Sequence, residues 1–321
     1  MSRTILVTGG AGFIGSNYIR HMLEREPMTK ILNLDAMTYA GVKATVDELN
    51  ELDGHQFVEG DIRDGALVRD LVAGVDAVVN FAAESHVDRS IDGPTVFLDT
   101  NVVGTGVLLD AAYKAGVPKY LQVSTDEVYG SLAEGFAKED APLLPSSPYS
   151  ASKAGADLLA SSYGVTFDYP VMITRCTNNF GPYQFPEKVI PLFVTNLLDG
   201  KKVPLYGDGK NERDWLYVDD HCSAIRVALD EGQPGETYNI GANAQLTNLE
   251  LTHQIMSALG ADESMIEYVA DRPGHDRRYA VDSDKIRALG WSPLHDFEQR
   301  LAETVDWYRN RTDWWRPLKS A

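Results

Sequence analysis

The chain has 321 residues, and its 29 Lys and Arg against 47 Asp and Glu give a formal net charge of -18 at pH 7. Such an acidic chain is unsuited to nucleic-acid or anionic-membrane surfaces, which both use clustered Lys and Arg. Cys176 and Cys222 are its only cysteines, too few for a disulfide scaffold and not spaced as a C-x-x-C motif. With no basic-apolar signal at the N-terminus and no apolar run near the roughly 20 residues that cross a bilayer, we expect a cytoplasmic protein that contacts neither nucleic acid nor membrane.

Short apolar runs bounded by turn residues predict buried parallel strands at residues 5–7, 31–34, 77–81, 120–123 and 171–173. Helical spacing of apolar residues occurs between them, at residues 13–26, 66–72, 96–115 and 149–162. This alternation predicts an α/β fold with a doubly wound, mostly parallel Rossmann sheet.

After about residue 177 the sequence changes to loops rich in Pro, Gly and aromatic residues, with short helices at 190–198 and 249–259. We expect residues 1–177 to form a dinucleotide-binding domain, and residues 178–213 and 242–321 to form a smaller mixed α/β substrate-binding lobe. The run at 215–218, the helix after it and the strand at 236–240 are expected to return to the first sheet, so that about 214–241 belongs to the first domain. A last helix is predicted at 297–308, and Trp314 and Trp315 are expected to serve packing.

The first predicted strand runs into a glycine-rich turn that opens a helix, with Gly9, Gly12 and Gly15 in a G-x-x-G-x-x-G arrangement. Glycines at these places let backbone N–H groups approach a pyrophosphate at the positive end of the helix. Asp35 ends the second strand, 20 residues after Gly15, where a carboxylate can accept hydrogen bonds from ribose hydroxyls and repel a 2′-phosphate. The pattern predicts NAD rather than NADP, with a solvated turn residue as the alternative reading of Asp35.

The fifth predicted strand ends in Ser-Thr-Asp-Glu-Val-Tyr-Gly over residues 124–130, and Tyr149 and Lys153 follow four residues apart. Tyr149 and Lys153 would share one face of a helix, and we expect the ammonium group to lower the pKa of the tyrosine so that it acts as a base near neutral pH. A lone Y-x-x-x-K is weak evidence, but together with a dinucleotide turn and Thr125 at a strand end it predicts a catalytic site. The alternative for Asp126 and Glu127 is an exposed turn.

Through residues 8–15 and 149–153 the chain resembles the extended short-chain dehydrogenase/reductases. Further motifs at residues 82–88, 124–130, 177–184 and 271–276 resemble, in order and over nearly the whole chain, the dTDP-glucose 4,6-dehydratase family. The triplet at 125–127 is the most specific, because related 4-epimerases usually lack the acid pair. Thr177 and Phe180 depart from the Cys and Tyr that are common in this family, and neither change removes a group with an obvious chemical duty.

The resemblance implies oxidation of the sugar at C4, loss of water from C5 and C6, and return of hydride to C6, with NAD as cofactor. Tyr149, assisted by Thr125, would take the proton of the 4-hydroxyl, and Lys153 would also bind the cofactor ribose. Glu127 would remove the C5 proton while Asp126, held protonated, protonates the leaving 6-hydroxyl.

The predicted site residues fall into two further sets. The cofactor set is Gly9, Gly12, Phe13, Ile14, Gly15, Asp35, Asp61, Ile62, Phe81, Ala82, Ala83, Ser85, Thr100, Tyr149, Lys153 and Asn179. The substrate set is Ser85, Thr125, Asn178, Lys188, Val189, Pro204, Tyr206, Arg213, Asn248, Arg272 and His275. Arg213 and Arg272 are the candidates to hold the diphosphate of a nucleoside-diphospho-glucose. No metal is expected, since His86 and His275 lack ligand spacing, and the resemblance implies a homodimer built on the helices at 96–115 and 149–162.

Two other functions remain open on the sequence. A nucleotide-sugar 4-epimerase or UDP-glucuronate decarboxylase would share the fold, but neither reaction needs Glu127 as a base beside a C6 acid. A non-catalytic dinucleotide sensor would share the fold too, without a need for Tyr149, Lys153 and both acids. Thymidine and uridine nucleotides are equally compatible with the sequence.

Overall fold

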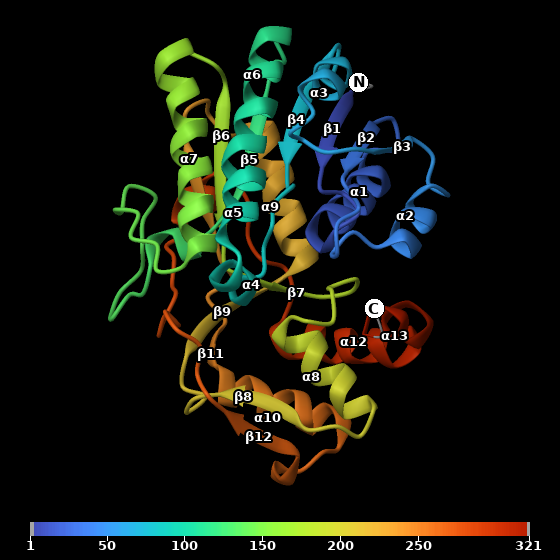
Figure 1. The fold of residues 1–321 in the computed structure, drawn as a ribbon, viewed down its shortest axis with the longest axis vertical. Helices are drawn as coiled ribbons and strands as arrows, with labels where there is room; N and C mark the ends of the chain where they lie inside the picture. The colour runs from blue at the N-terminus through green and yellow to red at the C-terminus, as the bar shows by residue number, and fades with distance from the viewer. Residues whose placement is uncertain (1–2, 320–321) are drawn as a thin grey trace.

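A computed structural model describes residues 3–319 (Figure 1). Its larger part is built on a seven-stranded sheet in which every neighbouring pair is parallel, in the order β10-β6-β5-β4-β1-β2-β3. The strands are β1 (Thr4–Thr8), β2 (Lys30–Asp35), β3 (His55–Glu59), β4 (Ala77–Asn80), β5 (Tyr120–Thr125), β6 (Val171–Cys176) and β10 (Thr237–Ile240). The central strands β4, β5 and β6 are buried along their whole length, which explains their continuous apolar runs. The predicted doubly wound fold is confirmed.

Helices cover both faces of this sheet. One apolar core joins the sheet to α1 (Phe13–Arg25) and α9 (Val218–Glu231), and a second joins its other face to α3 (Gly65–Val72) and α6 (Thr105–Ala115). The long helix α7 (Pro148–Phe167) stands beside α6 in Figure 1, while α9 lies behind the sheet. The larger part of the structure also contains the shorter helices α2 (Lys43–Leu49), α4 (Val87–Asp92), α5 (Pro94–Phe97) and α11 (Asp284–Ala288).

The helix predicted at 96–115 is interrupted by a π-helical segment, η1 (Leu98–Gly104), between α5 and α6. Asn101 lies in this wider turn and is buried, with its amide nitrogen 2.8 Å from Ser152 Oγ and 3.0 Å from the Glu84 carbonyl oxygen. Its side-chain oxygen accepts from the Glu84 N–H at 2.8 Å. The π segment therefore anchors the loop after β4, as such segments often do at functional sites.

A smaller mixed lobe lies below the main sheet in Figure 1. It holds a three-stranded sheet, β11-β9-β7, and a two-stranded sheet, β12-β8. Its elements are β7 (Asn178–Phe180), α8 (Val189–Leu198), β8 (Val203–Tyr206), β9 (Glu212–Tyr217), β11 (Gln245–Thr247), α10 (Asn248–Leu259), β12 (Ile266–Val269), α12 (Phe297–Asn310) and α13 (Thr312–Lys319). Trp314 and Trp315 are buried in its aromatic core, as predicted.

One strand does not lie where the sequence suggested. The run at 215–218 was predicted to return to the main sheet, but its strand β9 pairs with β7 and β11 in the small sheet, so this prediction is wrong. The edge of β6 that it would have needed is filled by β10, which pairs in parallel from Thr237↔Ile173 to Ile240↔Cys176. The helix α9 and the strand β10 do return to the larger layer. The domain boundaries given above remain a prediction.

A buried polar cluster joins the first strands beneath the cleft described below. Asn80 at the end of β4 accepts a hydrogen bond from Thr8 Oγ1 at 2.6 Å. Its amide nitrogen donates to Gln122 Oε1 at 2.8 Å and to Thr105 Oγ1 at 3.3 Å. All four side chains are buried, so one amide satisfies groups from β1, β5 and α6 together.

We expect Asn80→Ala to lower the free energy of unfolding by about 2–4 kcal/mol, because three buried polar partners lose their bonds and a cavity forms. Denaturant unfolding followed by circular dichroism measures this loss. Asn310→Ala, at the exposed end of α12, is the control and should change stability by less than about 0.5 kcal/mol. Equal stability of the two variants would contradict this account of Asn80.

Candidate active site

A cleft of about 370 Å³ lies at the carboxyl ends of the strands and takes lining residues from β2, β5 and β6 and from the loops after β1, β2, β3 and β4. Every residue predicted to bind the cofactor lines it, and so do Thr125, Asp126 and Glu127. Ligands of open parallel sheets bind at this edge, where the strand order reverses. In this sheet β1 has β4 on one side and β2 on the other, so the reversal is at β1.

The glycine turn brings three pieces of backbone into contact. A Cβ atom at Gly9, whose φ is 74°, would stand 2.7 Å from the Ala82 backbone nitrogen. One at Gly15 would stand 2.4 Å from the Gly9 carbonyl oxygen. The helix α1 begins at Phe13 with Gly12 at its N-cap and no side-chain cap, so its first N–H groups are left for a ligand. This cradle fits a dinucleotide pyrophosphate.

Asp35 lies beside this turn. Its carboxylate accepts hydrogen bonds from the Ala11 N–H at 2.9 Å and the Met37 N–H at 2.8 Å. Burial raises the pKa of Asp35, and the two backbone bonds oppose that rise. Each carboxylate oxygen keeps a further lone pair, so the group can accept hydrogen bonds from ribose hydroxyls. The structure places Asp35 in the cleft and not in a solvated turn.

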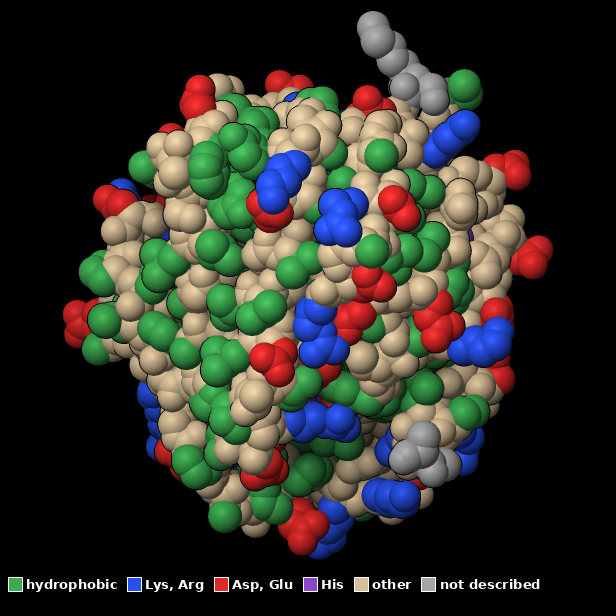
Figure 2. Space-filling view, turned by 45° about the horizontal axis from the view of Figure 1, so that its top comes forward, with side chains coloured by type: hydrophobic (Ala, Val, Ile, Leu, Met, Phe, Trp, Pro, Cys, Tyr) green, Lys and Arg blue, Asp and Glu red, His purple; other side chains and the backbone are tan. Residues whose placement is uncertain are grey.

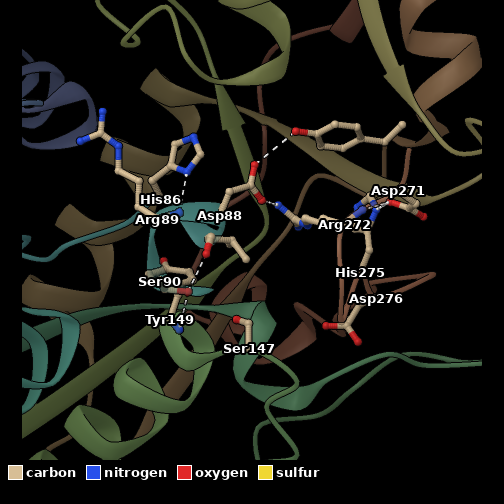
Figure 3. Close-up of polar contacts among 12 residues, drawn as sticks. His86, Asp88, Arg89, Ser90, Ser147, Tyr149, Asp271, Arg272, His275 and Asp276 are labelled. Carbon is tan, nitrogen blue, oxygen red and sulfur yellow. Dashed lines mark hydrogen bonds and ion pairs between the residues drawn. The ribbon is translucent and has the colours of Figure 1, made fainter. Parts of the chain in front are cut away.

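Two hydrogen bonds fix the N-terminal part of α7, one to the end of β5 and one to α4. Lys153 Nζ donates to the Val123 carbonyl at 2.7 Å. One turn earlier, the backbone N–H of Tyr149 donates to Ser90 Oγ at 3.1 Å, a contact shown in Figure 3. A capping box of Ser147 and Ser150 starts the helix just before Tyr149. Both Tyr149 and Lys153 therefore line the cleft from one helix face, as the spacing predicted.

The electrostatic prediction for Tyr149 needs a correction. Burial raises the pKa of Tyr149 well above its ordinary value, the charge of Glu127 raises it further, and a hydrogen bond with Thr125 opposes the rise. The Lys153 ammonium was expected to bring this pKa toward neutrality, and in this structure it does not outweigh burial. The sequence does not reveal how deeply the phenol is buried, and burial has a larger effect on its pKa than the charge of Lys153.

Asp126 and Glu127 follow Thr125 in the short 3₁₀ turn η2 (Asp126–Tyr129). Thr125 Oγ1 donates to Asp126 Oδ1 at 3.3 Å and accepts from the Glu127 N–H at 3.3 Å. Within residues 3–319, buried Asp126 Oδ2 has no hydrogen-bond partner. Burial raises the pKa of Asp126 well above its usual range, and the neighbouring charge of Glu127 adds to this. Asp126 is thereby favoured as a neutral acid.

Glu127 has a different environment. Burial raises its pKa as well, but Arg272, Arg213 and Lys188 oppose that rise. These three cations come from the smaller lobe or its connection to the larger one. They make Glu127 easier to ionise than Asp126, whose pKa is raised well above its usual range, and this difference suits Glu127 to act as the base and Asp126 as the acid.

The predicted substrate residues fall into two groups. Ser85, Thr125, Asn178 and Lys188 line the cleft, and Lys188 Nζ donates to the Ser85 carbonyl at 3.0 Å. The structure places the others outside the cleft lining: Val189, Pro204, Tyr206, Arg213, Asn248, Arg272 and His275. Val189 packs against the apolar core of the lobe, and Pro204 pairs with Glu267 between β8 and β12. Asn248 is the first residue of α10.

Several residues outside the cleft lining gather at its rim around Asp88. The Asp88 carboxylate accepts from Arg272 Nη1 at 3.1 Å and from the Tyr206 hydroxyl at 3.3 Å, and Figure 3 shows Arg272 pointing toward it. His275 Nδ1 lies 2.6 Å from Asp271 Oδ1, and the His275 ring packs edge-on against Tyr206 with centroids 6.2 Å apart. Asp88 thus joins α4 to the rim of the smaller lobe.

Sequence reasoning missed Asp88 as a contact of Arg272 and Tyr206, although it lies in one of the motifs noted above. It also missed cleft residues in the loops after β2 and β3, including Thr38, Gly41 and Arg63. Their position in the sequence could have indicated them, since both loops directly follow an acidic residue at the end of a strand. Within residues 3–319 no group of three or more His, Cys, Asp or Glu side chains is arranged to hold a metal ion. Over the same residues no helix is long and apolar enough to span a membrane.

Comparisons with known proteins agree with this geometry. A model of the GDP-mannose 4,6 dehydratase family matches residues 6–304. A dTDP-glucose 4,6-dehydratase of Streptomyces antibioticus is 54% identical over 321 residues, covering 98% of this chain and 95% of the relative. The chain belongs to the dTDP-glucose 4,6-dehydratase family.

The solved structures distinguish this family from its neighbours. The dTDP-glucose 4,6-dehydratase DesIV of Streptomyces venezuelae, solved with NAD and dTDP bound, has a TM-score of 0.96 and 53% identity, with 98% of this chain and 99% of that chain covered. The UDP-glucose 4-epimerase of Thermotoga maritima has a TM-score of 0.89 at 29% identity, with 96% and 99% covered. The shared fold explains the epimerase likeness, while the sequence places the chain with the dehydratases.

The contact at Gly15 gives a direct test of the cofactor cradle. We expect Gly15→Ala to reduce the dinucleotide retained after purification by about tenfold or more, because its Cβ would meet backbone atoms that cannot yield without moving α1. Absorbance and mass spectrometry of the nucleotide released on denaturation measure the loss. Gly164→Ala in α7 is the matched control, since its Cβ would meet its first neighbour at 3.8 Å. A Gly15→Ala protein with full retention would remove the assigned role.

Proposed function

We propose that this chain converts dTDP-D-glucose to dTDP-4-keto-6-deoxy-D-glucose, with NAD as a cofactor that stays bound through the cycle. The observation that carries the proposal is the pair Asp126 and Glu127 at the edge of a dinucleotide cleft. Burial raises the pKa of both acids, but Arg272, Arg213 and Lys188 oppose the rise at Glu127, whereas the charge of Glu127 adds to the rise at Asp126. Removal of water from C5 and C6 needs one base and one acid within reach of neighbouring carbons. This pair supplies both.

Tyr149 takes the proton of the sugar 4-hydroxyl, and Thr125 orients that hydroxyl. Bound NAD supplies the acceptor for the C4 hydride and later returns the hydride to C6. Burial alone disfavours the phenolate form of Tyr149. The positive charge of an oxidised cofactor held in the same cleft would favour that form. Lys153 holds the cofactor ribose with an ammonium group that is already oriented by the Val123 carbonyl.

Once C4 is a ketone, the hydrogen on C5 becomes acidic. Glu127 accepts that proton, and Asp126 gives its own proton to the departing 6-hydroxyl, so water leaves without an external acid. When hydride returns to C6, Glu127 gives its proton back to C5, which completes the 4-keto-6-deoxy sugar. Lys188, Arg213 and Arg272 assist in two ways, because they favour ionised Glu127 and are the candidates to meet the substrate diphosphate. Asn178 and Ser85 complete the sugar pocket on this proposal.

The remaining predicted contacts concern the nucleotide. Tyr206, Asn248 and His275, with Val189 and Pro204, are proposed to hold the nucleoside, away from the reacting carbons. A thymidine base is favoured by the named relatives, which act on dTDP-glucose. The proposed location is the cytoplasm, consistent with free, buried Cys176 and Cys222.

Substitutions of the acids and the tyrosine should stop the reaction at different points. Tyr149→Phe should fail at oxidation and accumulate no reduced cofactor, whereas Glu127→Gln should oxidise C4 and stall with NADH on the enzyme. Asp126→Asn should also stall before water loss, yet still exchange the C5 hydrogen with solvent. Each loss should be a factor of about 10²–10⁴ in the blocked step. Rapid-mixing absorbance at the NADH band, with product analysis by mass spectrometry in D₂O, separates the three.

Parallel incubations with dTDP-glucose and UDP-glucose identify the nucleotide. Near wild-type formation of the 6-deoxy product by Glu127→Gln would overturn the dehydratase role of that residue. A wild-type protein that interconverts epimers without a 4-keto-6-deoxy product would establish the epimerase reading.

A homodimer is part of the proposal and rests on an apolar face of α5, η1, α6 and α7. On α7 the exposed residues Leu158 and Val165 are seven positions apart, and Val96 of α5 and Val103 of η1 are exposed on the neighbouring run. A seven-residue spacing presents one stripe to a partner helix packed at a small angle. Figure 2 shows hydrophobic side chains gathered on the side where α6 and α7 lie. A second copy of the chain would cover this stripe and both valines about a two-fold axis.

Leu158→Glu should therefore shift the protein from dimer to monomer in light scattering at micromolar concentration. The introduced carboxylate would be buried against the partner without a counterion, which costs several kcal/mol of association energy. Leu294→Glu, at a residue that is 75% exposed on the other part of the chain, is the control and should leave the dimer intact. A monomeric wild type would remove this proposal without affecting the assigned chemistry.

A further inference from the structure

Three charged side chains are buried behind the catalytic residues. Lys153 and Asp157 are four residues apart on α7, one and two turns after Tyr149, and Arg175 on β6 pairs with Asp157. Their exposed fractions are 4%, 1% and 5%. Burying charges of this kind is costly, and replacement by apolar residues is often neutral or stabilising. The chemistry described so far uses only Lys153.

Arg175 is held firmly in this cluster. Its Nε donates to Asp157 Oδ2 at 3.0 Å, and its Nη1 donates to the Tyr129 hydroxyl at 2.8 Å and to the Glu139 carbonyl at 3.2 Å. The Tyr129 hydroxyl in turn donates a hydrogen bond to Asn239 Oδ1 at 2.8 Å. The guanidinium therefore presents a fixed positive charge to Asp157. Burial raises the pKa of Asp157, and Arg175, Ser124 and Lys153 oppose that rise.

Burial affects Lys153 in the opposite direction from Asp157. Burial lowers its pKa, because an ammonium group out of water tends to lose its proton. The Val123 carbonyl accepts a hydrogen bond from it but carries no net charge. Asp157 is the leading group that opposes the loss of the proton.

We propose that Asp157 is a positioning residue that keeps buried Lys153 in its ammonium form, and that Arg175 in turn keeps Asp157 ionised. The inference rests on the role given to Lys153 under the proposed function. It gives the buried residues Lys153, Asp157 and Arg175 a purpose in the reaction, since only a protonated Lys153 carries a positive charge beside Tyr149 and has all three N–H donors for the Val123 carbonyl and the ribose.

Other groups around Lys153 do not supply this counterion. On α7 itself, Tyr149 carries no permanent charge, because burial raises its pKa and its phenolate form depends on the bound cofactor. On β6, burial raises the pKa of the Cys176 thiol to about 12, so it too is neutral. Asp126 is favoured as a neutral acid, and the charge of Glu127 faces Arg272, Arg213 and Lys188. Asp157 is the carboxylate that remains.

The two ends of the ion pair make opposite predictions. Asp157→Asn removes the negative charge and leaves the Arg175 guanidinium uncompensated, so Lys153 should lose its proton at a lower pH. Activity that needs the ammonium form is present below the pKa of Lys153 and lost above it, so the alkaline limb should move to lower pH. Arg175→Met breaks the same buried pair but removes a cation, so the limb should stay in place or move to higher pH.

The experiment measures kcat/KM for dTDP-glucose and the rate of NAD release from the purified holoenzyme between about pH 7 and pH 10. Asp157→Asn should bring both alkaline transitions down by about one pH unit or more. Asp157→Glu, which keeps the charge, should restore them to near the wild-type position. Arg175→Met should not lower them. A merely structural ion pair would instead reduce stability in both single variants and leave the transitions unmoved.

Wild-type transitions in Asp157→Asn, or shifts of the same sign in Asp157→Asn and Arg175→Met, would overturn the proposal. If Asp157→Asn does not fold, Asp157→Asn combined with Arg175→Met removes the uncompensated guanidinium, and its transitions should still lie below those of Arg175→Met alone. The pH dependence of NAD release tests the role of Asp157 separately from the proposed function. A wild type without turnover on dTDP-glucose would refute the proposed function, and the pH dependence of NAD release would still decide the role of Asp157.

Discussion

The hydrogen bond from the Lys153 ammonium to the Val123 carbonyl, 2.7 Å long, joins the catalytic helix to the catalytic strand. It ties α7 to β5 two residues before Thr125, so the strand end that carries the hydroxyl and the acids cannot move independently of the helix that carries the tyrosine. The bond from the Tyr149 N–H to Ser90 Oγ fixes the same helix from the α4 side. With two fixed points, Tyr149 faces Thr125 without a contribution from bound ligands.

Burial away from water sets the protonation of the catalytic side chains that these hydrogen bonds position. Burial raises the pKa of Tyr149 and of Asp126 and lowers that of Lys153, so neutral forms are favoured wherever no partner intervenes. The partners are selective. Three cations oppose the rise in the pKa of Glu127, whereas at Asp126 the opposition of Arg213 is met by the charge of Glu127, which adds to the rise. The two adjacent carboxyl groups therefore differ in acidity, which suits one to act as a base and the other as an acid. An overall charge of -18 is no obstacle, because the cations that matter converge on one carboxylate.

The cofactor half of the site was predictable because its signals are local. Gly9, Gly15 and Asp35 belong to one strand-turn-helix unit whose geometry follows from residue type and spacing, and all of them line the cleft. Strand β9 was misplaced because its pairing depends on which edge β10 leaves free, and that is a property of the whole sheet. The pKa of Tyr149 was misjudged for a related reason. Spacing reveals a neighbouring ammonium, but the extent of burial is set by elements far away in sequence.

The substrate half was less predictable, since its residues come from several loops whose positions no single motif fixes. The resemblance supplied Arg272 and Tyr206, but only the folded chain shows that both meet Asp88 at the rim. The strand β7 was also missed, although it carries Asn178 and Asn179 into the cleft. Three residues are too few to show a period, so such a strand becomes visible only through its pairing with β9.

Much of the cleft wall is held in place through α7. Asn101 in the π segment holds both backbone groups of Glu84 and donates to Ser152 on α7, so the loop that carries Ser85 follows that helix. Lys188 in turn donates to the Ser85 carbonyl, which brings a residue of the second lobe into the same chain of contacts. A shift of α7 would thus move the phenol, the ammonium, the β4 loop and Lys188 together. A regular α-helix would rotate Asn101 away from these partners. The hydrogen bonds of Asn101 therefore offset the weaker local hydrogen bonding of the π-helical segment.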